Sequence, residues 1–338
     1  TGFNPHMTQP KLLLLSPAFH GYWKAIQASL EVHGYEVRTH IYDAPGTLPE
    51  RILNKLAHEL PEKYRPESFA AQATRKAIDA FNEFRPDIVL VIKGDMLSRE
   101  WWDLLETSGV RYGTWLYDEM RRMSYTEEDL HHLGALASYS PLDAQHLREQ
   151  GFEVLDMPNA YDTHCPVVPM REDSINFVGA KYPNREETLQ ALVAAGLPVR
   201  AYGRAWSRHP YDILRTKQFK DSGVPAGRDI DRSEAYGIMA SSRATLNIHN
   251  NQDGFTMRTF EAPGVGALQV IDRADVDHYY IPGEEVLVYE SIDELIEICT
   301  RIFREPKWAR QIREAGQKRT LAEHTFDQRV KILEQLWA

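Results

Sequence analysis

Hydrophobic residues in the first half of the chain fall into short runs separated by stretches with helical spacing. The run Ile88–Ile92 is uninterrupted, as in a central parallel strand whose two faces are both buried. Phe69–Phe84 instead repeats its apolar residues on one helical face. This alternation predicts a doubly wound parallel sheet. The expected strands here are Leu12–Leu15, Glu36–Tyr42, Ile88–Ile92, Thr114–Tyr117 and Ala135–Tyr139, with a further helix over Trp23–His33.

The second half repeats the same plan. A helix is expected over Glu186–Ala195, because its leucines and a valine share one face. The final segment, Asp327–Trp337, also has an apolar stripe and predicts a helix. The expected strands are Ile175–Val178, Val199–Tyr202, Ala244–Ile248, Ala267–Ile271 and Val286–Tyr289.

A segment rich in proline and polar residues, Met157–Asp173, separates the two halves and is typical of a linker. The sequence therefore predicts an α/β protein of two Rossmann-like lobes with a deep interdomain cleft. The lobes are expected at residues 7–157 and 174–326, joined by a linker at 158–173, with a helix at 327–338 packing back on the first lobe. Ligands of such sheets bind beyond the carboxyl ends of the strands, so polar residues that follow strands are the candidates for chemistry.

Length, charge and cysteine content narrow the class of protein. The chain has 338 residues, enough for two domains of about 150 each. Its formal net charge of −10 argues against a protein that coats nucleic acid. Its apolar runs are shorter than the roughly 18 residues that a membrane span needs. Cys165 and Cys299 fit no metal pattern and are interpreted as free thiols, so a cytoplasmic location is expected.

The loop and helix expected between Ala244–Ile248 and Ala267–Ile271 carry the strongest chemical signal. Gly254 marks a turn, and a short helix is expected from about Thr256. The N-terminus of a helix attracts a diphosphate, and Arg258 could neutralise a phosphate oxygen there. Glu261, about one turn later, could accept hydrogen bonds from two vicinal ribose hydroxyls. Asp253 precedes Glu261 by eight positions.

This segment resembles the Glu-x7-Glu motif of retaining GT-B glycosyltransferases, with Asp253 in place of the first glutamate. The run from Phe255 through Arg258 to Ala262, followed by Gly264, is still more similar to the CgeB-like glycosyltransferase family. The resemblance covers most of the chain and is strongest over residues 175–330. Other segments similar to that family are Trp115–Asp118, Phe177–Lys181 with Arg185, Tyr202–Trp206, Gly283–Val286 with Tyr289, Glu294-Leu295, Gly316, and His324–Phe326 with Arg329.

The resemblance implies a GT-B fold and the transfer of a sugar from a nucleoside diphosphate sugar to an acceptor hydroxyl, with retention favoured. A UDP-sugar is the favoured donor substrate, and no cofactor or metal is expected. Because aspartate is one methylene shorter than glutamate, the contact of Asp253 with the sugar is the weakest part of the match. The candidate residues for binding the sugar donor are Gly21, Gly179, Lys181, Arg204, Asp253, Gly254, Phe255, Thr256, Arg258 and Glu261.

Candidate catalytic residues in the first lobe follow expected strands. Asp118 follows Thr114–Tyr117 and could act as a general base on an acceptor hydroxyl. His20 follows Leu12–Leu15, and the backbone N–H groups at His20-Gly21 could approach the diphosphate. Asp118 could instead cap a helix over Glu119–Met123.

Other interpretations of the charged residues stay open. Glu261, Arg258, Lys181 and Arg204 could be helix-terminal or solvated charges, and Asp253 could be a cap or turn residue. Two Asp-x-Asp sequences, Asp229-Ile230-Asp231 and Asp275-Val276-Asp277, resemble metal motifs, but Asp231 precedes a helical run and is interpreted as its cap. His249 has no partner at ligand spacing and is interpreted as a solvated or capping residue.

Two other functions remain possible on the same fold: a nucleotide-sugar epimerase, which needs no acceptor, and a non-catalytic two-lobed sugar-binding protein. The sequence does not name the acceptor. A polysaccharide, a small molecule, a protein and modified DNA all remain open.

Overall fold

The computed structural model describes residues 9–44, 49 and 68–338. The chain forms two compact units. The first comprises the chain up to Pro158 together with Phe326–Ala338, and the second comprises Asn159–Thr325. Residues 159–173, which the sequence analysis assigned to a linker, therefore contact mainly the second unit.

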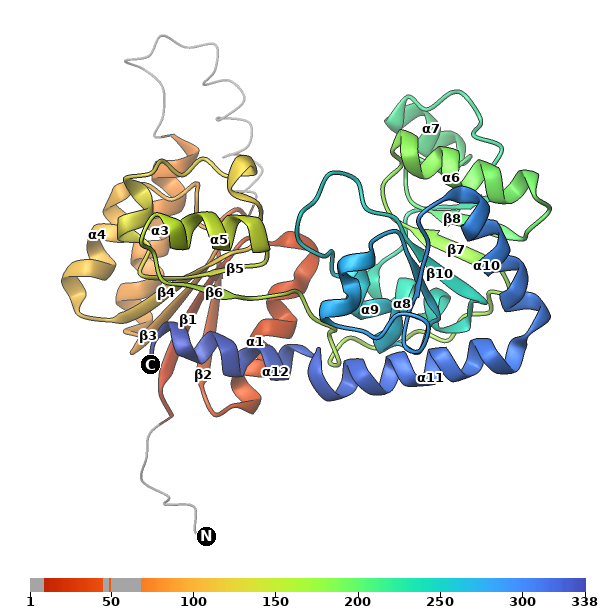
Figure 1. The fold of residues 1–338 in the computed structure, drawn as a ribbon. Helices are drawn as coiled ribbons and strands as arrows, with labels where there is room; N and C mark the ends of the chain where they lie inside the picture. The colour runs from red at the N-terminus through yellow and green to blue at the C-terminus, as the bar shows by residue number, and fades with distance from the viewer. Residues whose placement is uncertain (1–8, 45–48, 50–67) are drawn as a thin grey trace. The chain divides into compact units, whose positions relative to one another are not determined.

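The first unit is built on a six-stranded parallel sheet in the order β2-β1-β3-β4-β5-β6 (Figure 1). β1 pairs with β2 on one side and β3 on the other, so the strand order reverses between β1 and β3. All five residues of β3 are buried, which accounts for its continuous apolar run. The strands are β1 (Lys11–Ser16), β2 (Glu36–Ile41), β3 (Ile88–Ile92), β4 (Arg111–Leu116), β5 (Ala135–Ser138) and β6 (Val154–Asp156).

Helices cover both faces of this sheet (Figure 1). They are α1 (Tyr22–Val32), α3 (Phe69–Phe84), α4 (Arg99–Ser108), α5 (Pro141–Glu149) and α12 (Phe326–Leu333), with the short turns η1 (Phe19–Gly21), η3 (Met120–Arg122), η4 (Asp129–His132) and η6 (Glu334–Leu336). The C-terminal helix α12 lies against α1. Beyond it, Leu336 packs so closely on β4 that a Cβ at Gly113 would lie 2.7 Å from the Leu336 Cβ.

The second unit contains another six-stranded parallel sheet, in the order β12-β11-β10-β7-β8-β9. Its order reverses between β7 and β10, because β7 pairs with β8 on one side and with β10 on the other. The strands are β7 (Ile175–Val178), β8 (Val199–Tyr202), β9 (Ala226–Gly227), β10 (Ala244–Asn247), β11 (Gln269–Ile271) and β12 (Leu287–Val288).

Six helices and one short turn surround the second sheet. They are α6 (Pro183–Ala194), α7 (Pro210–Thr216), α8 (Arg232–Ser241), α9 (Arg258–Gly264), α10 (Ile292–Arg304), α11 (Pro306–Glu323) and η5 (Ala274–His278). α9 sits between α8 and α11, and a Cβ at Gly264 would lie 2.4 Å from the ring of Tyr161. This close approach requires glycine and fixes α9 against the segment that opens the unit.

The α/β class with two parallel Rossmann-like sheets, predicted from the sequence, is confirmed. The ten expected strands all occur, three of them with the predicted bounds: β3, β7 and β8. β6 and β9, which are only three and two residues long, were not predicted from the sequence. The helix expected from Thr256 begins two residues later, at Arg258. Among the described residues, no helix is long and apolar enough to cross a membrane.

Candidate functional site

Apart from Gly21, which lies in the first unit, the residues predicted to bind the sugar donor follow strands at one edge of the second sheet. Gly179 and Lys181 follow β7, Arg204 follows β8, and the segment 253–261 follows β10. These three strands are neighbours and parallel, so their carboxyl ends meet at the same edge. The strand order reverses between β7 and β10, and such a reversal is where open α/β sheets bind their ligands.

A buried polar network holds the turn before α9 against the sheet. The Nδ2 of Asn247 donates to the Thr259 Oγ1 at 2.9 Å and to the Gln269 Oε1 at 3.0 Å. The Gln269 Nε2 donates in turn to the Thr259 carbonyl at 3.0 Å, and the Thr256 hydroxyl donates to the Asn247 Oδ1 at 3.4 Å. Because Asn247 ends β10 and Gln269 begins β11, this network fixes the turn relative to both strands. A fully satisfied buried network of this kind favours one loop conformation.

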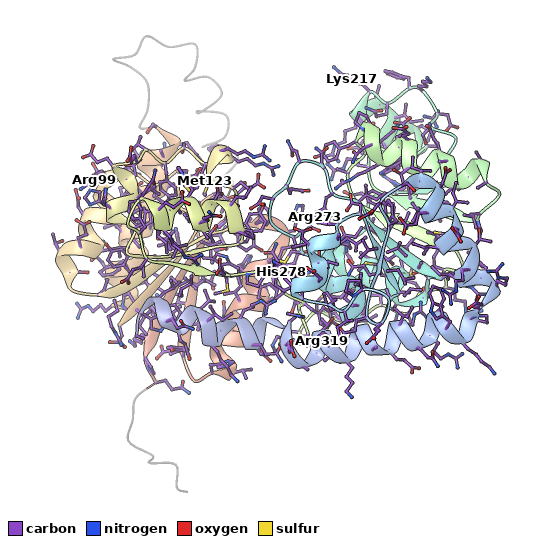
Figure 2. The ribbon with its side chains drawn as sticks, viewed as in Figure 1. Arg99, Met123, Lys217, Arg273, His278 and Arg319 are labelled. Atoms are coloured by element: carbon purple, nitrogen blue, oxygen red, sulfur yellow. The ribbon has the colours of Figure 1, made fainter. Side chains whose placement is uncertain are left out.

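Phe255 anchors the loop between β10 and α9. Its ring is 5% exposed and meets the rings of His249 and Tyr279 edge to face. The Arg273 guanidinium lies 4.1 Å from the centre of the same ring. Arg273, labelled in Figure 2, also donates to the carbonyls of Gln252 at 3.2 Å and Gly254 at 3.4 Å. Phe255 was predicted to bind the sugar donor. In the structure its side chain is enclosed by these contacts, which hold the loop in place.

Arg258 and Glu261 form an ion pair within α9. The Arg258 Nη1 lies 3.5 Å from the Glu261 Oε1, and its Nη2 donates to the Val178 carbonyl at 3.4 Å, at the end of β7. The Arg258 side chain is 22% exposed, whereas that of Glu261 is 1% exposed. In this structure Arg258 therefore faces the carboxyl edge, and the Glu261 carboxylate is enclosed behind it. The predicted contact between Glu261 and a ribose stays a prediction.

Arg185 connects the loops that follow β7 and β10. Its Nε donates to the Ile248 carbonyl and its Nη1 to the Ala180 carbonyl, each at 2.9 Å. Burial lowers the pKa of Arg185, and the neighbouring Arg258 acts in the same direction. The edge between β7 and β10 therefore holds two cations close together, which favours an anion there.

The cations after β7 and β8 differ in exposure. The Lys181 Nζ lies 3.3 Å from the Glu186 Oε2 and 5.7 Å from the centre of the Trp206 ring, and its side chain is 9% exposed. The Arg204 side chain is exposed and pairs with Asp229 at 2.9 Å. Gly179 lies between these loops: a Cβ at Gly203 would lie 2.7 Å from the Gly179 carbonyl oxygen. Lys181 is therefore the better placed of the two cations to reach an anion beside Arg258.

His249 is a candidate that the sequence analysis set aside. His249 lies two residues after Asn247, just beyond the end of β10, and its side chain is 3% exposed. Its backbone N–H and its Nδ1 each lie 2.9 Å from an oxygen of Asp272. Among the described residues its buried Nε2 has no hydrogen-bond partner. The interpretation of His249 as a solvated residue was therefore wrong, because Asp272, 23 positions later, closes over it.

The interpretation of Asp231 as a helix cap is confirmed. Asp231 and Glu234 form a capping box at the start of α8, each accepting from the other's backbone N–H. In the second Asp-x-Asp sequence, Asp275 pairs with Arg273 and Asp277 with His278. Within residues 9–44, 49 and 68–338, three or more His, Cys, Asp or Glu side chains do not converge as a metal site would require.

In the first unit, Asp118 and Lys93 lie at the carboxyl ends of the neighbouring strands β4 and β3. The Lys93 Nζ lies 3.5 Å from the Asp118 Oδ2, and the Glu119 N–H donates to the Asp118 Oδ1 at 2.9 Å. The alternative role of Asp118, as the cap of a helix over Glu119–Met123, was wrong. Only the short turn η3 forms there, its cap is Glu119, and the Met120 N–H is bound by the Asp143 carboxylate.

His20 and Gly21 follow β1, at the same edge of the first sheet. Both have positive φ values, 52° and 76°, and a Cβ at Gly21 would meet no atom within 4 Å. The neighbouring Phe19 ring packs edge to face on Tyr117, 5.2 Å away, beside Asp118. The first unit thus brings the turn that carries His20 close to the end of β4. Whether His20 and Gly21 touch a ligand stays a prediction.

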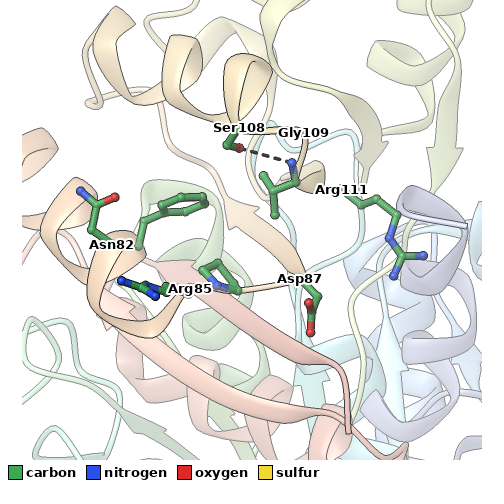
Figure 3. Close-up of a pocket in the computed structure, with 9 residues that line it drawn as sticks. Asn82, Arg85, Asp87, Ser108, Gly109 and Arg111 are labelled. Atoms are coloured by element: carbon green, nitrogen blue, oxygen red, sulfur yellow. Dashed lines mark hydrogen bonds between the residues drawn. The ribbon is translucent and has the colours of Figure 1, made fainter. Parts of the chain in front are cut away.

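A wide pocket of about 810 Å³ in the first unit lies elsewhere (Figure 3). Asp87 and Val110, which line it, precede β3 and β4, so the pocket is at the amino edge of the sheet. Its charged groups hold the chain in place: Asp87 accepts from the Lys11 N–H at 2.8 Å, and Arg111 donates to the Trp337 carbonyl at 3.3 Å. We do not assign the reaction to this pocket, because the candidate residues lie at the opposite edge.

The chain is similar to known glycosyltransferases in sequence and in fold. Residues 185–335 match the family model described as Glycosyl transferase-like. The chain is 20% identical over 265 residues to the spore protein CgeB of Bacillus subtilis (strain 168), which covers 72% of this chain and 81% of CgeB. The fold is similar to that of sucrose-phosphate synthase from Thermosynechococcus elongatus, with a TM-score of 0.64, 14% identity, and coverage of 97% and 98% of the two chains.

The fold is also similar to that of Anabaena Alr3699/HepE, which was solved in complex with UDP-glucose. The TM-score is 0.62 at 12% identity, and the match covers 97% of this chain and 98% of that one. Residues 185–335 therefore resemble the glycosyl transferase-like family, the chain shows distant homology to CgeB, and its fold matches GT-B glycosyltransferase structures. The matched residues begin at Arg185 and include the whole of the segment 253–261.

Proposed function

We propose that this protein transfers a sugar from a nucleoside diphosphate sugar, with a UDP-sugar favoured, to an acceptor hydroxyl, without a metal and with retention at the anomeric carbon. The observation that carries the proposal is the position of Arg258. Arg258 is the first residue of α9 and donates to the Val178 carbonyl at the end of β7, where the strand order of the sheet reverses. Its side chain is partly exposed. The UDP-glucose bound by Alr3699/HepE, which shares the fold, supports the choice of nucleotide.

The sugar donor would bind at the carboxyl edge of β7 and β10. Arg258 and Lys181 would face the diphosphate, because both lie at the end of β7: Arg258 donates to the Val178 carbonyl, and Lys181 follows that strand. Arg185 would act indirectly, by joining the two loops through its bonds to Ile248 and Ala180. Asp253, in the partly exposed part of the loop, would contact the sugar.

These groups account for catalysis without a metal. As the bond from the anomeric carbon to the diphosphate breaks, negative charge grows on the leaving oxygen. A fixed guanidinium beside that oxygen stabilises the transition state more than the ground state, because the charge is greatest there. Glu261 contributes by holding Arg258 in place, since its carboxylate is enclosed and ion-paired. We propose retention because the Asp253–Glu261 spacing follows the Glu-x7-Glu motif.

The acceptor-side groups would come from the first unit. Asp118 lies at the end of β4 with a carboxylate that is 25% exposed and bound to Lys93. A carboxylate in this position can orient an acceptor hydroxyl or accept its proton.

Isothermal titration calorimetry with UDP and UDP-glucose, in the presence of excess EDTA, tests the proposal. We expect binding that EDTA does not change and that Arg258→Gln weakens. Arg208→Gln supplies a control, because Arg208 is an exposed arginine of the same unit, 3.8 Å from Asp221, and is not among the candidate residues. Binding that is lost in EDTA would disprove metal-independence. Binding unaffected by Arg258→Gln would remove the assigned site.

The same experiment separates the two rival functions. An epimerase would alter the sugar of the donor without any acceptor, so incubation with UDP-sugars followed by chromatography would show a new UDP-sugar. A non-catalytic binding protein would return the donor unchanged with every acceptor. A transferase releases UDP only as the sugar reaches an acceptor or water.

A further inference from the structure

A small pocket in the second unit is lined by three arginines. It has a volume of about 120 Å³ and is lined by Ser242, Arg243, Ile302, Pro306, Ala309, Arg310 and Arg313. Ser242 and Arg243 immediately precede β10, so the pocket lies at the amino edge of the sheet. It is therefore separate from the carboxyl edge to which we assign the sugar donor.

The pocket is formed along one face of α11. Ala309 and Arg310 follow Pro306 by three and four residues and precede Arg313 by four and three, which places all four on the same side of the first two helical turns. α11 has 18 residues and begins without a side-chain cap. Its N-terminus therefore adds a partial positive charge to that of the arginines.

Only one of the three arginines pairs with a carboxylate among the described residues. Arg313 donates to the Ser242 carbonyl, which is neutral. Arg243 pairs with Asp173, whose side chain is 81% exposed. Among the described residues, Arg310 forms no ion pair or hydrogen bond. Burial lowers the pKa of Arg313, and Arg243 and Arg310 lower it further. Three like charges around one pocket repel each other unless an anion lies between them.

We propose that this pocket binds a phosphate group, either inorganic phosphate or the phosphate of a monoester whose remainder extends into solvent. Planar guanidinium groups bind phosphate oxygens in pairs, and the volume admits one such group but no nucleotide. Carboxylates are less suited, because Arg310 and Arg313, which pair with no carboxylate among the described residues, match an anion of two charges better than an anion of one. The proposal is independent of the assigned transferase function.

Thermal unfolding in inorganic phosphate, compared with chloride at the same ionic strength, tests the proposal. Phosphate should raise the melting temperature, because a ligand of the native state stabilises it. Arg310→Gln should shift the half-maximal phosphate concentration upward by about tenfold or more, as expected for a lost charge-assisted hydrogen bond. Without phosphate, Arg310→Gln should melt at the same temperature as the wild type or higher, because it relieves repulsion. If Arg310 had a structural role, Arg310→Gln would lower the melting temperature in the absence of phosphate.

Two variants locate the effect. Lys307→Gln removes a charge from the same helix outside the pocket and should keep the phosphate response. Arg258→Gln should also keep it, because Arg258 lies at the opposite edge. The proposal fails if phosphate and chloride act alike or if Arg310→Gln keeps the full response. It also fails if Lys307→Gln or Arg258→Gln removes the response as Arg310→Gln does.

Repeating the titration with glycerol phosphate separates the two ligands: a lower half-maximal concentration than for inorganic phosphate identifies a monoester as the ligand, and a higher one identifies inorganic phosphate.

Discussion

The imidazole of His249 is held by Asp272, with 2.9 Å between Nδ1 and Oδ1. The carboxylate accepts the hydrogen bond, so Nδ1 carries the proton of this contact and Nε2 is the ring nitrogen left for another partner. That atom is buried, and no other described residue satisfies it. A buried polar atom without a partner costs about 1–3 kcal/mol, so we expect a ligand bound at this edge to supply one.

We predict that His249→Asn lowers the affinity for UDP or a UDP-sugar by about tenfold or more and leaves the melting temperature nearly unchanged. Asparagine can keep the bond to Asp272 but has no atom at the position of Nε2. His249→Gln places a polar atom near Nε2 and should restore part of the affinity. Calorimetry measures both variants. His278→Asn is the control, since His278 is an exposed histidine of the same unit (Figure 2). Unchanged affinity in His249→Asn would exclude His249 from the site.

A second prediction concerns Arg258 and Glu261. Arg258→Gln and Glu261→Gln should each weaken UDP binding by about 10-fold to 100-fold, the range for charge-assisted hydrogen bonds. If Glu261 acts by holding Arg258, the double variant should bind about as weakly as the weaker of the two single variants. Independent contacts, with Glu261 on the ribose as the sequence predicted, should give losses that add. A double-mutant cycle by calorimetry distinguishes these outcomes, and additive losses would contradict the positioning role.

The fold was predictable because the strands carry local signals. The apolar run of β3 and the alternation of β2 are visible without any partner. β9 escaped prediction because its two residues, Ala226-Gly227, follow Pro225 and carry no apolar pattern. Its strand character comes only from pairing with β8.

The site was predictable in part, for a different reason. The segment 253–261 has a recognisable spacing, but the surroundings of each residue depend on partners distant in sequence. The His249 ring is held by Asp272, 23 positions later, and Arg185 donates to the Ile248 carbonyl, 63 positions away. The burial of Glu261 and Phe255 depends equally on tertiary packing. Asn247 ends the buried strand β10, and Gln269 begins the buried strand β11. Polar residues at these two positions were the sequence signal that could have indicated the hydrogen-bond network before α9.

A third prediction concerns Asp212, a residue of α7 whose carboxylate binds Arg228, just after β9. Its carboxylate accepts from Arg228 at 2.9 and 3.2 Å and from the Ser207 hydroxyl at 2.7 Å. These bonds, Arg228 first, lower the pKa of Asp212. A lowered pKa in the folded state adds stability above the unfolded value of about 3.9, and this stability is lost as the pH falls through the folded value.

Asp212→Asn should therefore lower the melting temperature at pH 7, and the difference from the wild type should shrink as the pH falls below about 4. Thermal unfolding followed by circular dichroism across this pH range measures the effect. Asp221→Asn is the matched control, because Asp221 is an exposed aspartate 3.8 Å from Arg208. A difference that stays constant down to pH 2 would show that the charge of Asp212 does not contribute.

The last prediction is that Asp118 is needed for transfer and not for binding of the sugar donor. Asp118 and Lys93 end neighbouring strands of the first unit, 3.5 Å apart. Asp118→Asn keeps an oxygen that can accept from the Glu119 N–H, so the local backbone should hold. It cannot accept a proton, and the transfer rate should fall by about 10²–10⁴. The assay is release of UDP from a UDP-sugar with an acceptor found by screening. Asp95→Asn is the control, because Asp95 follows β3 and binds the Ser124 N–H at 3.0 Å. Loss of transfer in Asp118→Asn alone, with UDP affinity and melting temperature unchanged, supports the role. Full transfer by Asp118→Asn would leave Asp118 only the hydrogen bond and ion pair that shape the end of β4.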